Sequence, residues 1–237
     1  FVLGEHREEN FKDVAAVLQN PDVPKENKFV AIARANNIPI FSDVTRETGS
    51  LDPMSIESHL TSRTRAILVV HQFGIPAEMD AILAMARRHG LRVIEDCAQA
   101  HGAFYRGRPV GTLGDIGVFS LNVNKTIQTG EGAVCLTNDE DLRYRLALIR
   151  NHGEAVVGPA GYEAITNMVG LNLRLTELAA AMAIQQLVKL ESLTAIRLRY
   201  VEALSRALQA HPGIIPPPAC GHAAFGAPSS CGCRSTY

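Results

Sequence analysis

Apolar and polar positions follow two different periods through the middle of this chain. Residues 66–70 (AILVV) form a short apolar run, which is typical of a strand buried on both faces of a parallel sheet. Residues 78–89 instead carry apolar side chains at helical spacing and stop at Gly90, a residue type that commonly ends helices. A second apolar run at 91–94 predicts the next strand. Strands separated by amphipathic helices indicate βαβ units, so we expect an α/β fold with a largely parallel sheet.

The same periods predict further elements on both sides of this unit. They are strands at 38–44, 117–121 and 133–137, and helices that begin at Asp52-Pro53 and extend over 139–150. The longest pattern is an apolar stripe over residues 176–209, which predicts one helix of roughly 50 Å at about 1.5 Å per residue. A helix of that length cannot be buried in one small core, so we expect it to bridge to another domain or subunit.

The two ends of the chain differ from this middle part. Residues 1–28 are charged and mixed in character, with one short predicted helix at 10–19, and residues 211–237 are rich in proline and cysteine without a hydrophobic period. The sequence therefore predicts an atypical N-terminal segment (1–28), a large α/β domain (29–175), a long interdomain helix (176–210) and a disordered tail (211–237).

Composition narrows the class of protein. The 237 residues are 46% hydrophobic and 20% charged with a net charge of -1, which excludes a disordered chain and gives no general attraction to nucleic acid or anionic lipid. No apolar run reaches the roughly 18 residues of a membrane span, and the N-terminus does not have the form of a signal peptide. We expect a soluble, cytoplasmic protein. Cys97 and Cys135 lie in strand-like contexts and are predicted to be buried thiols, and the cysteine spacing predicts no metal site.

The candidate chemistry lies between residues 95 and 133. The stretch contains EDCAQAHGA (95–103), GDIGVFSLNVNK (114–125) and TGEGA (129–133). Asp96 ends one predicted strand, Ser120 ends the next, and Lys125 follows five residues later. Taken singly, each has a structural explanation as a turn cap or a solvated charge. Ligands of parallel α/β sheets bind at the carboxyl ends of the strands, however, and a carboxylate, a hydroxyl and an amine among glycines suit a phosphorylated aromatic cofactor. Pyridoxal 5′-phosphate (PLP) is such a cofactor, because it needs a lysine for its Schiff base and an acid facing its ring nitrogen.

These motifs, in this order, resemble the DegT-type (DegT/StrS) sugar aminotransferases, a family of PLP enzymes. Further landmarks are TRAILVVHQFG (64–74), RNHGE (150–154) and GLNLRLTELAAA (170–181), and the resemblance covers about residues 29–210. It implies the aspartate aminotransferase-like fold (PLP fold type I), in which helices flank the mostly parallel sheet of a PLP-binding large domain. Nothing before Phe29 matches the family's phosphate-binding turn, and the long helix runs into the tail instead of a small C-terminal domain. The resemblance thus predicts a chain truncated at both ends.

The resemblance also implies a role for each site residue. Lys125 matches the lysine that holds the cofactor covalently and then moves the proton between substrate and cofactor. Asp96 matches the acid that keeps the ring nitrogen protonated. Gln99 matches a hydrogen-bond donor to the ring hydroxyl, and Ser120 matches a ligand of the phosphate.

Further positions follow from the same resemblance. Asn172 matches an asparagine that reaches the cofactor of the neighbouring subunit, which implies a homodimer with shared active sites. Phe29 lies where the family places an aromatic side chain over the cofactor ring, although a core phenylalanine is nearly as good an interpretation. His71 and His101 are better explained as packed or hydrogen-bonded side chains, and Glu131 as a brace of the glycine turn. We therefore assign none of these three residues to the predicted site.

The implied activity is amino transfer from L-glutamate or L-glutamine to a keto sugar, preferably a nucleotide-linked one, in the biosynthesis of amino sugars, polysaccharides or antibiotics. A keto-cyclitol acceptor is the alternative within the family. Related deoxysugar dehydratases carry histidine in place of the lysine, so Lys125 argues against that reaction. An inactive or regulatory fragment of the same family is the remaining alternative.

Overall fold

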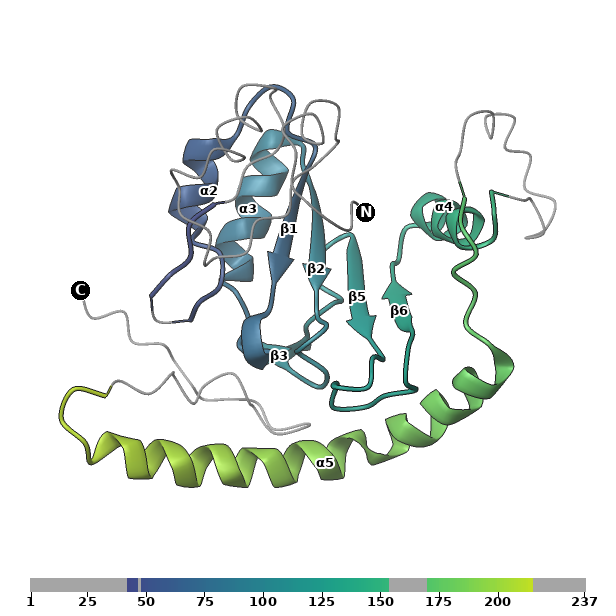
Figure 1. Cartoon of the computed structure of the whole chain (residues 1–237). Coiled ribbons are helices and arrows are strands. Elements are labelled where there is room, and N and C mark those ends of the chain that lie inside the picture. The colour runs from purple at the N-terminus through teal and green to yellow at the C-terminus, as the bar shows by residue number, and fades with distance from the viewer. Residues whose placement is uncertain (1–41, 47, 154–169, 215–237) are drawn as a thin grey trace, which may run out of the picture.

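The computed structural model describes residues 42–46, 48–153 and 170–214. Its centre is a four-stranded sheet in the order β1-β2-β5-β6 (Figure 1). The strands are β1 (Ala66–Val70), β2 (Arg92–Asp96), β5 (Ile116–Ser120) and β6 (Ala133–Leu136). β1, β2 and β5 run parallel, and β6 is antiparallel to β5. The α/β fold with a largely parallel sheet is therefore confirmed, and the four strands lie where the apolar runs predicted them.

Four helices lie where the periods predicted them: α2 (Pro53–His59), α3 (Met79–His89), α4 (Glu140–Arg150) and α5 (Glu177–Gln209). The short 3-10 helix η2 (Gln72–Gly74) was not predicted. The Asp52 side chain caps α2 by accepting the Met54 N–H at 2.9 Å, and Asp139 caps α4 in the same way. Gly90 ends α3 at φ 63°, a left-handed conformation that glycine adopts without steric cost.

The main core lies between the sheet and the helices α2 and α3. Its buried members are Ile56, Ile67, Val69, Ala77, Met79, Ile82, Met85, Ala86 and Val93. Fully burying each large apolar side chain contributes about 1.5–3 kcal/mol, so this layer is the main source of stability in the described part of the chain. The prediction that 66–70 is buried on both faces is wrong. Ile67 and Val69 face this core, whereas Leu68, which points to the other face of the sheet, is 44% exposed.

A second small core supports the region after β2. It consists of Cys97, Ala100, Ala103 and Val110, and it lies beside a hairpin of β3 (Phe104–Tyr105) and β4 (Arg108–Pro109) that the sequence pattern did not predict. Gly111 and Gly117 cross here so closely that a Cβ on Gly117 would overlap the Gly111 backbone. The loop before β5 is therefore pressed directly onto the sheet.

The last strand shows where a prediction failed. All four residues of β6 are exposed, because β6 lies at the edge of this sheet and neither of its faces is deeply packed. Cys97 is buried as predicted, but Cys135 lies on β6 and is exposed, so the prediction of a buried thiol at Cys135 is wrong.

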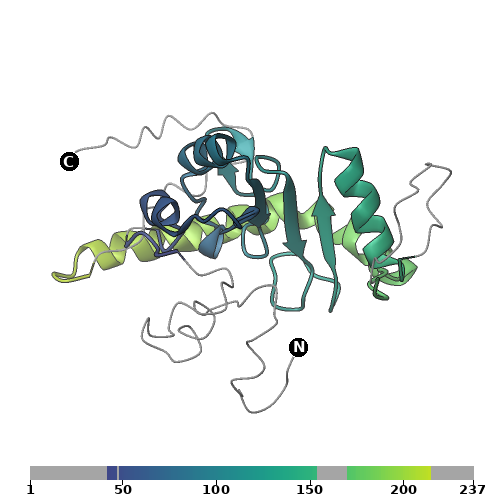
Figure 2. The ribbon, with the colours of Figure 1, turned by 90° about the horizontal axis from the view of Figure 1, so that it is seen from above.

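The long helix α5 runs beneath the carboxyl ends of β1, β2 and β5 (Figures 1 and 2). Thr176 caps it by accepting the Ala179 N–H at 3.2 Å. It packs on the loop after β5 through a small apolar cluster in which Leu190 contacts Leu121 and Ile127. In the ranges that the structure describes, no helix is long and apolar enough to cross a membrane. The predicted helix at 10–19, most of the predicted strand at 38–44, and residues 215–237 of the tail lie outside these ranges.

Candidate active site

Asp96 lies at the carboxyl end of β2 and is held in place by the main chain. Its carbonyl oxygen accepts the N–H of His71 at 3.1 Å, and the following Cys97 N–H donates to the carbonyl of Val118 at 2.8 Å. These two bonds fix the end of β2 between β1 and β5. The half-buried Asp96 carboxylate accepts one bond, from the Ala98 N–H at 2.9 Å. It has no cationic partner among the described residues, so it is available to a ligand.

Gln99 lies in the turn that follows β2, and its side chain is oriented by a neighbouring loop. The side-chain oxygen accepts the N–H of Phe73 at 2.9 Å. Because a backbone N–H can only donate, this bond assigns the oxygen and leaves the NH2 group of Gln99 as a donor. A donor is what the resemblance requires at this position.

Ser120 ends β5, and a compact loop carries the chain from there to Lys125. The Ser120 hydroxyl accepts the N–H of Asn122 at 3.2 Å. The Lys125 N–H donates to the carbonyl of Asn122 at 2.9 Å, and the Thr129 N–H donates to the carbonyl of Leu121 at the same distance. Ser120 and Lys125 are therefore presented at the carboxyl end of the strand that pairs with β2.

The loop is braced from two sides, while the Lys125 amine stays available. The Glu131 carboxylate accepts the side-chain N–H of Asn122 at 2.9 Å, which agrees with the predicted bracing role of Glu131. Leu121 and Ile127, on either side of Lys125, are buried against α5. Lys125 itself is half-buried, and within the described ranges its amine has neither an ion-pair nor a hydrogen-bond partner.

One predicted site residue does not join this group within the described chain. Asn172 is exposed and forms an isolated antiparallel bridge with Asn151 at the end of α4, where the Leu173 N–H donates to the carbonyl of Arg150 at 3.0 Å. Within one chain it therefore lies beside α4 instead of the ends of β2 and β5. Its role across a dimer stays a prediction, and Phe29 lies outside the described residues.

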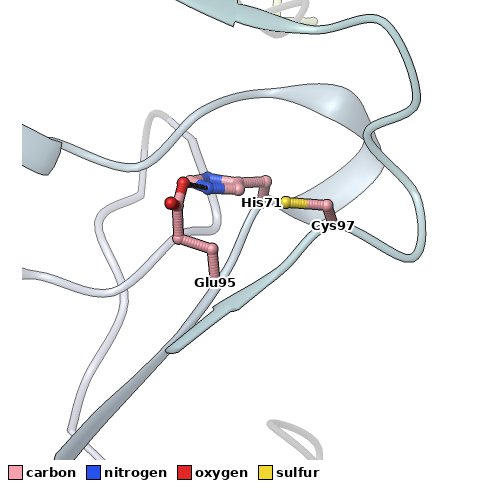
Figure 3. A group of neighbouring side chains, drawn as sticks. All are labelled: His71, Glu95 and Cys97. Atoms are coloured by element: carbon pink, nitrogen blue, oxygen red, sulfur yellow. Dashed lines mark hydrogen bonds and ion pairs between the residues drawn. The ribbon is translucent and has the colours of Figure 1, made fainter. Parts of the chain in front are cut away.

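Glu95, which the sequence analysis did not single out, is a fully buried acid on the opposite face of β2 from Asp96. It accepts a hydrogen bond from His71 Nε2 at 3.0 Å (Figure 3). It also accepts hydrogen bonds from the N–H groups of Gly111, Leu113 and Gly114 at 2.8, 2.7 and 2.6 Å. Burial acts to raise the pKa of the Glu95 carboxyl, but the bonds from His71 and the three backbone N–H groups outweigh it and hold the pKa below its ordinary value. The acid is thus a buried anion that ties β1, β2 and the loop before β5 together.

His71, Glu95 and Cys97 form a cluster whose ligand atoms lie within 4.8 Å of one another (Figure 3). The Ala77 N–H donates to His71 Nδ1 at 3.2 Å, so His71 is neutral and donates to Glu95 through Nε2. Burial, together with the nearby carboxylates of Glu95 and Asp96, raises the pKa of the Cys97 thiol and keeps it protonated. With both ring nitrogens and both carboxylate oxygens engaged, the cluster is structural, and the predicted hydrogen-bonded role of His71 is confirmed.

The groups at the strand ends fit pyridoxal phosphate. Among the described residues, Lys125 supplies an amine without a partner and Asp96 a carboxylate with an open oxygen. Gln99 supplies an amide donor and Ser120 a hydroxyl, and all four follow two paired parallel strands. This set provides a partner for the aldehyde, the ring nitrogen, the ring hydroxyl and the phosphate.

Comparison with known proteins decides the family. Residues 28–228 match the model of the DegT/DnrJ/EryC1/StrS aminotransferase family. The chain belongs to this family. Among curated relatives, the L-glutamine:scyllo-inosose aminotransferase of Streptomyces griseus is 42% identical over 181 residues, which are 74% of this chain and 43% of that protein. GDP-perosamine synthase of Caulobacter vibrioides is 41% identical over 176 residues, which are 72% of this chain and 46% of that protein.

A solved structure extends the likeness to three dimensions. DesV of S. venezuelae superposes with a TM-score of 0.69 at 35% identity, covering 83% of this chain and 52% of that one. The aspartate aminotransferase-like fold expected from the sequence is thereby confirmed, and so is PLP as the cofactor that the family implies. The chain spans less than half the length of the two curated relatives.

Proposed function

We propose that this protein acts in amino transfer from L-glutamate or L-glutamine to the keto group of a sugar, with a nucleotide-linked keto sugar as the preferred acceptor. One observation carries the proposal. In a DegT-family chain, the Lys125 amine, which has no partner in the described part of the chain, follows the strand that pairs with the strand ending in Asp96. A histidine in place of Lys125 would indicate a dehydratase instead.

Each site residue has a task in this reaction. When bound, PLP supplies an electron sink that lets the substrate carbon lose a proton. Lys125 anchors the cofactor and, once released, carries that proton as a general base and acid. Asp96 holds a proton on the ring nitrogen through its negative charge. Gln99 donates its amide N–H to the ring hydroxyl, and Ser120 donates its hydroxyl to the phosphate.

The anchoring step is tested by adding PLP to the purified chain, reducing with borohydride and digesting for mass spectrometry. We expect the cofactor mass on the peptide that contains Lys125 and its loss in Lys125→Ala. Lys189→Ala, an exposed lysine of α5, is the matched control and should leave labelling unchanged. Equal labelling of wild type and Lys125→Ala contradicts the assignment, and no labelling of either supports the inactive fragment.

A keto-cyclitol is a second candidate acceptor, because the Streptomyces griseus relative is named for scyllo-inosose. GDP-perosamine synthase is an equally similar relative whose name points to a nucleotide-linked sugar. Incubation with L-glutamine and either scyllo-inosose or a nucleotide-linked 4-keto sugar, followed by mass spectrometry of the amine product, distinguishes the two acceptors.

The proposal includes a homodimer in which Asn172 reaches the cofactor of the neighbouring subunit. Its exposure, away from the strand ends of its own chain, supports a role in another chain. Mixed dimers of Lys125→Ala and Asn172→Ala chains should recover activity that neither homodimer has, because one of the two hybrid sites is intact. No recovery in verified heterodimers contradicts the shared site.

A further inference from the structure

A cleft of about 340 Å³ lies between the turn after β2 and the second half of α5. The polar residues of its wall include Gln99, His101, Thr126, Thr194 and Arg197. Gln99 and Thr126, the neighbour of Lys125, place the cleft beside the candidate cofactor site. Its size is that of a pocket for a small molecule.

The wall of the cleft is positively charged. Arg197 is the one charged residue among the described residues that line the cleft, and none of them is acidic. Its Nη1 donates to the hydroxyl of Thr126 at 2.7 Å, which holds the guanidinium at the cleft while leaving other N–H donors of this exposed side chain free. A guanidinium held in this way suits a carboxylate, which it can bind through two parallel hydrogen bonds.

The wall also contains buried polar groups without partners. His101 is only 8% exposed, and neither of its ring nitrogens has a hydrogen-bond partner among the described residues. The Thr194 hydroxyl is buried and unpartnered in the same sense. Buried polar groups in native proteins are rarely left unpaired, and a polar occupant of the cleft that reaches these groups would pair them.

The electrostatics of His101 agree with an anion there. Burial lowers the pKa of His101, and the nearby cations Lys125 and Arg197 lower it further. The backbone of Ser120 acts to raise this pKa, although its geometry does not make a hydrogen bond to either ring nitrogen. The imidazole is therefore neutral, with one N–H to donate. A bound anion would offset the two cations and raise this pKa.

We propose that this cleft binds the carboxylate of the amino-acid donor, with Arg197 as its ionic partner and with His101 and Thr194 as hydrogen-bond donors. The identity of the ligand as an amino donor rests on the proposed function, whereas binding of a carboxylate does not. L-Glutamate and L-glutamine both carry the required group. A neutral cyclitol acceptor would leave the positive charge of Arg197 unused. The one arginine of this wall matches the single charge of a carboxylate better than the doubly charged diphosphate of a nucleotide-linked acceptor.

Glutarate is the probe, because it carries the carboxylates of a glutamate-like ligand but has no amino group to transfer. It is titrated into the chain without PLP, while the His101 ring signals, assigned by their absence in His101→Gln, are followed by NMR. We expect saturable shifts and a rise in the pKa of His101. Arg197→Gln should weaken binding about tenfold or more, and Thr194→Val a few-fold. Arg206→Gln, an exposed arginine of α5 outside the cleft, is the matched control and should bind as wild type does.

Several results would overturn the proposal: no saturable shift, equal glutarate binding by wild type and Arg197→Gln, or the same shifts with myo-inositol. These outcomes are separate from those of the PLP experiment. Glutarate binding without cofactor labelling of Lys125 keeps the carboxylate site and removes the aminotransferase function. Cofactor labelling of Lys125 without glutarate binding keeps the aminotransferase function and removes the carboxylate site.

Discussion

Glu95 and Asp96 are neighbours on one strand, yet their surroundings are opposite. Glu95 is fully buried and accepts four hydrogen bonds from His71 and three backbone N–H groups. Asp96 is half-buried, accepts one bond and keeps an open oxygen at the end of β2. Successive side chains of a strand point to opposite faces, so a single step along β2 separates an acid with a structural role from one that can bind a ligand. The number of hydrogen bonds that each carboxylate accepts, more than its burial, distinguishes the two acids.

The largest expected effect comes from Glu95→Gln. The amide NH2 of the glutamine would face two of the four N–H donors and could not accept their hydrogen bonds. His71 cannot become an acceptor at Nε2 by changing tautomer, because its Nδ1 already accepts the Ala77 N–H. With each buried, unsatisfied donor costing about 1–3 kcal/mol, we expect a loss of about 3 kcal/mol or more in the free energy of unfolding, measured with urea. Glu57→Gln, which removes an exposed acid paired with Arg88, should change the free energy of unfolding far less, because exposed ion pairs contribute little. Equal stabilities of the two variants would show that the buried network adds nothing.

Asp96→Asn should instead change the reaction rate and leave the stability of the fold nearly unchanged. Because its carboxylate accepts only one backbone bond, the free energy of unfolding should change by less than about 1 kcal/mol. Loss of the negative charge beside the ring nitrogen should instead slow amino transfer by about 100-fold, or about 2.7 kcal/mol. Single-turnover rates with PLP bound measure this effect. A large loss of stability with an unchanged rate would assign Asp96 the structural role that we give to Glu95.

The same contrast explains how much the sequence could predict. Local patterns were sufficient for the four strands and for α2 to α5, and the motif spacing placed Asp96, Gln99, Ser120 and Lys125 at the strand ends. The network of Glu95 was missed because it joins β1, β2 and the 111–114 loop. The only local signals were an acidic pair at a strand end and a histidine after the preceding strand. The bond between Arg197 and Thr126 spans 71 positions and has no local signal at all.

Exposure was the property that local patterns predicted least well. Cys135 and Leu68 lie in apolar runs and were expected to be buried, yet both are exposed. An apolar run shows that a strand suits a sheet, but which of its faces is covered depends on elements that are distant in the sequence.

The smallest effect is a difference in how stability depends on pH. The folded pKa of Glu95 lies below its ordinary value of 4.5, so the unfolded chain takes up the proton first. The stabilisation is therefore complete above the unfolded pKa and is lost as the pH falls through the folded pKa, with a slope from this one group of at most about 1.4 kcal/mol per pH unit. Urea unfolding from neutral pH down through this acid range should show a shallower loss in Glu95→Gln than in wild type. Glu57→Gln should keep nearly the full slope, since exposed ion pairs contribute little and are screened by salt. Parallel curves for wild type and Glu95→Gln would mean that Glu95 titrates alike in the folded and unfolded chain, which its four hydrogen bonds argue against.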